Sequence, residues 1–90
     1  MTRNPMLIKA MSVYNQEEEL IYNLIFKNAF YSLECFKKGK CKENLLNYCF
    51  VENITDDEGE AEFFFKIVTK GKVLPVHIEE VAKDYLAAYK

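Results

Sequence analysis

The stretch Leu20–Phe36, with the sequence LIYNLIFKNAFYSLECF, is the segment on which the fold prediction depends. Twelve of its seventeen residues are apolar or aromatic. Asn15 and three glutamates precede it, a pattern typical of a helix start, because a capping side chain and acidic residues stabilise the positive end of the helix dipole. Two lysines and Gly39 follow it, which is the matching stop pattern. The sequence therefore predicts one long helix from about residue 16 to 38.

Helical patterns also fit the segments on either side. Apolar residues recur at helical spacing over 6–14 and, more weakly, over 41–53. A capping box at Thr55 opens a segment that ends with Lys70 and Gly71, and Pro75 opens a last amphipathic segment. We therefore predict an all-α bundle of four to five helices, in a single domain that spans residues 1–90.

One part of the chain has a second interpretation. Between Ala61 and Thr69, apolar residues also alternate with charged ones, as they would in a strand that follows a turn. The helix is favoured there, because start and stop signals bracket both ends of the segment. The alternative is an α+β fold with a hairpin at about 48–69.

The composition describes a small folded protein. The chain has 90 residues, 50% of them hydrophobic, with only three glycines and two prolines, which argues against disorder and against a second domain. The net charge of −2 argues against nucleic acid or an anionic membrane as a partner of the whole molecule. No segment reads as a signal peptide or a membrane span, so we expect a cytoplasmic protein whose three cysteines are reduced.

Catalytic and metal-binding motifs are not visible. His77 has no evident nucleophile or orienting carboxylate, and Cys35, Cys41 and Cys49 lack the spacing of a zinc site. Lysines surround Cys41, as they do around reactive thiolates, but no resolving thiol is close in sequence, so an inert thiol is preferred. The acidic residues of 52–62 do not have EF-hand spacing. We predict no enzyme, no cofactor and no metal.

A basic turn gives the alternative function. Four lysines, at positions 37, 38, 40 and 42, lie within six residues. If the segments on either side were helices, Lys37, Lys38, Lys40 and Lys42 would form a phosphate-contacting turn of a DNA-associated regulator. The segment 41–53, which would read the bases, offers few of the side chains that base recognition uses. Lysines that complement a helix dipole are the simpler interpretation.

The main functional prediction rests on the apolar excess of the long helix. On a helical projection Phe26 and Phe30 fall on the polar side, where a second molecule could cover them. The candidate interface comprises Asn23, Phe26, Lys27, Phe30 and Glu34. We therefore predict a small non-enzymatic interaction or regulatory protein that forms a homodimer through this helical face.

Overall fold

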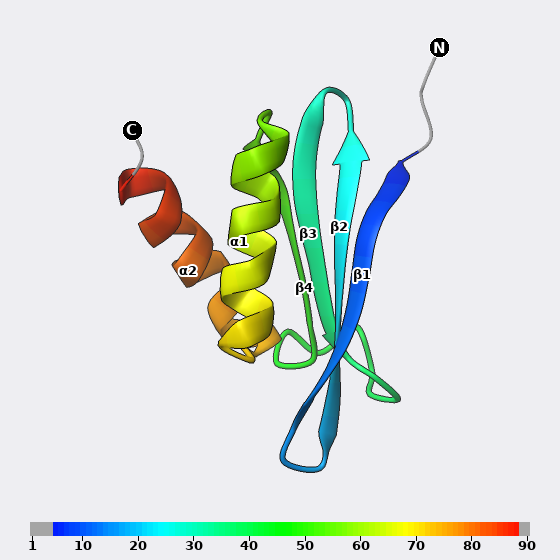
Figure 1. Ribbon diagram of the computed structural model, residues 1–90. Coiled ribbons are helices and arrows are strands. Elements are labelled where there is room, and N and C mark those ends of the chain that lie inside the picture. Colours follow the sequence, from blue (N-terminus) through cyan, green and yellow to red (C-terminus); the bar gives the residue numbers. More distant parts are fainter. Residues whose placement is uncertain (1–4, 89–90) are drawn as a thin grey trace.

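The protein is a four-stranded antiparallel sheet with two helices packed on one of its faces (Figure 1). The computed structural model describes residues 5–88; residues 1–4 and 89–90 of the predicted single domain lie outside the described residues. In chain order the elements are β1 (Met6–Asn15), β2 (Glu18–Lys27), β3 (Phe30–Lys37), β4 (Tyr48–Thr55), α1 (Glu58–Lys70) and α2 (Pro75–Ala88). The strands are also neighbours in chain order, so the sheet is a simple meander.

The predicted all-α bundle is therefore wrong, and the long helix is the clearest error. Its residues form β2 and β3, joined at Asn28 and Ala29, which have φ values of 52° and 70°. Two left-handed residues in a row are the geometry of a two-residue hairpin turn. Residues Leu20, Tyr22 and Leu24 are fully buried, and the residues between them are only partly buried, as in a strand with one covered face. The apolar residues that a helical projection puts on opposite sides of the predicted helix thus lie on the two opposite faces of a β-hairpin.

The other helix signals in the first half of the chain mark turns. The β1–β2 hairpin turn consists of Gln16, with a φ of 59°, and Glu17, while Asn15 and Glu18 are the paired strand residues on either side of it. Gly39 has a φ of 79°, a conformation that glycine adopts easily, but it follows a strand rather than a helix. The predicted helix at 6–14 is β1, and the one at 41–53 is part of a loop followed by most of β4. Capping residues and turn residues belong to the same small set, so local sequence did not separate the two.

The two C-terminal helices are confirmed. The N-cap of α1 is Asp57 and not the predicted Thr55, which is the last residue of β4. The side chain of Asp57 accepts a hydrogen bond from the backbone N–H of Glu60 at 2.8 Å, and Gly71 follows the last residue of the helix. Pro75 is the first residue of α2. The alternative prediction had the correct class, α+β, but its hairpin at about 48–69 is wrong, because α1 occupies most of that range and β4 pairs with β3 instead.

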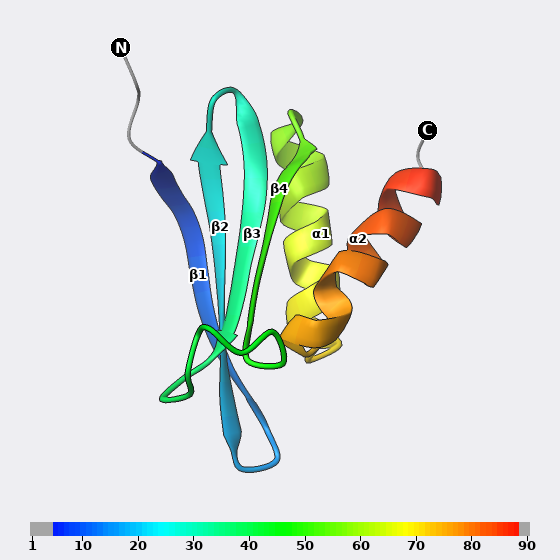
Figure 2. The ribbon, with the colours of Figure 1, turned by 180° about the vertical axis from the view of Figure 1, so that it is seen from behind.

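The core lies between the sheet and the helices. Phe64, Phe65 and Val68 of α1 and Ile78 of α2 are buried against the inward side chains of β2 and β3. At the end of the core the Tyr22 hydroxyl donates a hydrogen bond of 2.8 Å to the Val73 carbonyl, which fixes the α1–α2 connection to the sheet. The helices pack over β2, β3 and β4, and α2 contacts mainly β4. Figures 1 and 2 show that β1 lies at the edge farthest from α2.

Replacement of one central leucine tests this core. Leu33 is fully buried in β3, so we expect Leu33→Ala to lower the free energy of unfolding by about 2–5 kcal/mol, through lost apolar contact and the cavity left behind. Leu45, which is 82% exposed in the loop after β3, is the matched control. Leu45→Ala should change the free energy of unfolding by less than about 0.5 kcal/mol. Urea unfolding followed by circular dichroism measures both. Equal effects at the two positions would contradict the described core.

Candidate functional site

The face of the sheet opposite the helices carries the most distinctive surface of the protein (Figure 2). Because strand side chains alternate between faces, the register places two sets of residues on opposite sides of the sheet. We call the side away from the helices the open face. Its residues include Leu7, Ala10, Ser12, Tyr14, Glu19, Ile21, Asn23, Ile25, Ser32, Glu34, Phe36, Tyr48 and Phe50. None of them is among the buried hydrophobic residues of the core, and of this set only Ser32 is buried.

A carboxylate occupies the middle of the open face. Glu34 lies between Asn23 of β2 and Phe50 of β4 in the register. Asn23 Nδ2 donates to one of its oxygens at 2.9 Å, and the Tyr48 hydroxyl donates to the other at 2.8 Å. Partial burial, together with the hydrogen bond to Glu34, raises the pKa of Tyr48 to about 12. The charge at the centre of the face is therefore held in place by neutral donors.

Aromatic rings flank this carboxylate on one side. The rings of Phe36 and Tyr48 are stacked, with centroids 6.4 Å apart and an interplanar angle of 27°. The Lys42 ammonium, from the loop after β3, lies 4.2 Å from the Phe36 centroid and 5.8 Å from that of Tyr48, within the range of a cation–π contact. The loop thus reaches over one end of the open face. Ile21 and Ile25 continue the apolar surface across β2.

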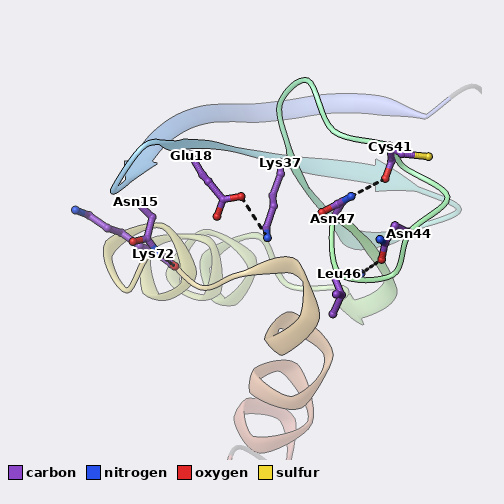
Figure 3. Close-up of polar contacts among 8 residues, drawn as sticks. All are labelled: Asn15, Glu18, Lys37, Cys41, Asn44, Leu46, Asn47 and Lys72. Carbon is purple, nitrogen blue, oxygen red and sulfur yellow. Dashed lines mark hydrogen bonds and ion pairs between the residues drawn. The ribbon is translucent and has the colours of Figure 1, made fainter.

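The loop 38–47 is ordered by its own asparagines (Figure 3). Asn44 Oδ1 accepts from the Leu46 N–H at 2.9 Å, and Asn47 Nδ2 donates to the Cys41 carbonyl at 3.1 Å. The Lys37 N–H donates to the Asn47 carbonyl at 2.9 Å, which closes the loop at the sheet. These bonds explain why a segment without a strand or helix still positions Lys42 over the rings.

The structure distributes the predicted interface over three places. Asn23 and Glu34 are hydrogen-bonded partners in the middle of the open face. Phe26 lies on the helix side, where its ring contacts Tyr31 at a centroid distance of 4.8 Å and packs against the core. Lys27 and Phe30 are paired at the β2–β3 turn. A helical interface built on Phe26 and Phe30 therefore does not exist, because the two residues belong to different strands.

The lysine turn is already engaged with the protein itself. Lys37 Nζ lies 3.4 Å from a Glu18 carboxylate oxygen (Figure 3), and Lys38 Nζ lies 3.6 Å from one of Glu19. Lys42 lies over the aromatic rings, and Lys40 lines a mixed-charge hollow with Glu17. The segment after the turn is a loop and a strand, so the helix that would have read DNA is absent. The alternative of a DNA-associated regulator stays a prediction.

The residues considered for chemistry are dispersed. His77 is exposed at the start of α2, and its Nδ1 lies 4.0 Å from a Glu80 carboxylate oxygen. Cys35 is buried and faces Cys49 across β3 and β4, while Cys41 is exposed in the loop. Among residues 5–88, no three His, Cys, Asp or Glu side chains gather in a cluster suited to a metal ion. The described helices include none that is long and apolar enough to cross a membrane.

Of the predicted interface residues, Asn23 and Glu34 lie in the middle of the open face, and most other residues of this face were not predicted. Ile21, Ile25, Phe36 and Phe50 were not predicted as site residues. In β3 a period of two was present as a signal, since Tyr31, Leu33 and Cys35 alternate with Ser32 and Glu34, but in β2 apolar residues occupy both faces. The stronger helix signals at both ends of that stretch concealed it.

Comparison with known proteins gives the family but no activity. Residues 5–88 match the family model described as a family of unknown function, DUF6514, and the chain belongs to that family. No curated protein and no solved structure matches the chain significantly.

The environments of the three cysteines predict their order of reaction with iodoacetamide. Burial raises the pKa of Cys35 to about 12 and also raises that of Cys49, so both remain thiols at pH 8, and Cys35 has no access to reagent. We expect native protein at pH 8 to be alkylated first at Cys41 and at Cys35 only after unfolding in urea. Peptide mass spectrometry measures the order.

The control is Cys41→Ser, which should remove the fast alkylation of the native protein and leave the reactions of Cys35 and Cys49 unchanged. Because alkylation requires the thiolate, raising the pH to 9 should leave Cys35 almost unreactive in the folded protein. Alkylation of Cys35 at the rate of Cys41 under native conditions would contradict the described burial.

Proposed function

We propose that this protein is a small non-enzymatic interaction protein that binds a partner protein through the open face of its sheet. The observation that carries the proposal is the difference between the two faces of the sheet. Both helices pack on one face, whereas the other presents aromatic and aliphatic side chains around Glu34. Apolar patches of this kind, with a few fixed polar groups, are typical of protein-binding surfaces.

The chemistry of the open face supports a protein segment as the partner. Phe36, Tyr48 and Phe50 are of the residue types enriched at interfaces, and their rings are held in place by the strand backbone and by Lys42. Glu34 gives the face one negative charge at a defined position. An apolar segment with one basic residue would match both features. Its basic group would compete with Asn23 and Tyr48 for the carboxylate.

The proposal includes a cytoplasmic location. Its support is the set of three free cysteines, two of which face each other across neighbouring strands without a disulfide.

Photocrosslinking at matched positions tests the proposed surface. Phe50 on the open face and Ile67 on α1 are each 37% exposed, so a benzophenone side chain can replace either of them at the surface. We expect crosslinks to a partner protein in cells when the group replaces Phe50, and none to that protein when it replaces Ile67. Ile25→Asp should abolish the Phe50 crosslink, because it adds a charge to the same apolar face.

Circular dichroism of Ile25→Asp is needed to show that the sheet is intact. Crosslinks that are the same from Phe50 and Ile67, or that persist in folded Ile25→Asp, would remove the open face as the binding surface. A crosslinked product that contains only two copies of this chain would replace the partner protein with self-association through that face.

A further inference from the structure

The outer edge of β1 is the most exposed part of the sheet and is not paired with another strand of residues 5–88. β1 is ten residues long, and residues Met6–Ser12 are all exposed, although the strand is paired to β2 on its inner side. Its large apolar side chains range from Ile8 at 38% exposed to Tyr14 at 61%, and Met11, on the helix side, lines a shallow hollow with Phe63 of α1. An edge strand also has backbone N–H and C=O groups that no neighbouring strand pairs. In Figures 1 and 2 no helix or strand of residues 5–88 lies along the outer side of this edge.

The two edges of the same sheet are protected to different degrees. In β4 the regular pairing covers only residues 48–51, after which exposed Glu52 and left-handed Asn53, with a φ of 54°, interrupt the strand. Such charges and irregularities are the usual means by which proteins prevent edge pairing. In β1 the regular pairing runs unbroken from Lys9 to Asn15. Its only charged side chain, Lys9, is on the helix side, 3.4 Å from a Glu62 carboxylate oxygen.

We propose that β1 pairs antiparallel with β1 of a second copy of this chain, with Ser12 facing Ser12 at the two-fold axis. The register follows from the register shift between Leu7 and Lys9, which limits the regular stretch to residues 9–15. An antiparallel pair that uses all of this stretch has its centre at the midpoint, Ser12. The inference is independent of the partner proposed for the open face.

The side chains of β1 are complementary to themselves in this register. Met11 faces Val13 on the helix side, and Ala10 faces Tyr14 on the open side, so apolar groups meet on both faces. Lys9 faces Asn15, which avoids the like-charge contact that would destabilise a pair. A foreign strand would need its own match to this pattern. A second copy already has it, and for this reason we choose a second copy as the occupant.

The dimension of the edge is sufficient for a weak dimer. The paired stretch of seven residues, with Met11 and Tyr14 at 42% and 61% exposed, offers on the order of 350 Å² per copy, or about 700 Å² in total, which is in the range of weak, transient interfaces. We expect a dissociation constant on the order of 100 μM. The axis is perpendicular to the sheet, because residues that face each other must lie on the same side. Both helix layers therefore lie on one side of a continuous eight-stranded sheet.

Charge substitution at the axis tests the proposal. Sedimentation of the wild type between about 1 and 200 μM should show a monomer–dimer equilibrium. Ser12→Glu places two carboxylates opposite each other, next to Glu19 of each copy, and should weaken the dimer at least about tenfold. Val76→Glu adds the same charge on α2, away from β1, and should leave the dissociation constant of the dimer unchanged. When the Ser12→Lys variant is mixed with the Ser12→Glu variant, a heterodimer should form, because a lysine then faces a glutamate at the axis.

A crosslink gives the register directly. In a Cys41→Ser background, which removes the exposed native thiol, Ser12→Cys should form an intermolecular disulfide with oxidised glutathione, and Val76→Cys should not. A wild-type monomer at 200 μM would overturn the proposal, and so would a folded Ser12→Glu that still dimerises. Ile25→Asp separates the two proposals, since it should remove the partner crosslink and leave the β1 dimer intact.

Discussion

The rest of the structure depends on the antiparallel pairing of β2 with β3. Eight consecutive residue pairs, from Leu20 with Lys37 to Lys27 with Phe30, fix which side chains lie on each face. A shift of one residue would exchange the two faces and expose Tyr22 and Leu24. The turn at Asn28 and Ala29 sets that register, since a two-residue loop leaves no freedom in it. β1 and β4 then add to the two sides of this hairpin, and α1 packs on the face that it makes apolar.

The sequence predicted the two C-terminal helices correctly and the four strands wrongly, for one physical reason. In α1 and α2 the capping residues, the apolar spacing and the charges all indicate the same element, and tertiary contacts agree with them. In β2 and β3 the local signals disagree. Asn15 with its glutamates and Gly39 are compatible with helix ends and with hairpin turns, and both faces of the hairpin are apolar. Only pairing partners distant in sequence decide between these structures.

The candidate site could be predicted only in fragments for the same reason. Asn23 and Glu34 were predicted as interface residues, and they do meet, but through strand pairing rather than along a helix. Phe36 and Tyr48 are twelve positions apart and become neighbours through the β3–β4 register. The lysine turn looked like a free basic patch because Glu18 and Glu19, its partners, are almost twenty positions away in sequence. Long-range contacts define this surface, and the sequence alone does not supply them.

The open face and the β1 edge are exposed for the same reason, which is that the chain has only two short helices to cover the sheet. The two helices, of 13 and 14 residues, cover one face of about three strands, and they leave most of β1 and the opposite face exposed. Pairing of two β1 strands about an axis perpendicular to the sheet places both open faces on the same side. Two copies of the carboxylate and its aromatic neighbours then belong to one surface. A partner that carries the recognised segment twice would bind the second copy at a raised effective concentration, so edge pairing would strengthen binding at the open face without adding a contact to it.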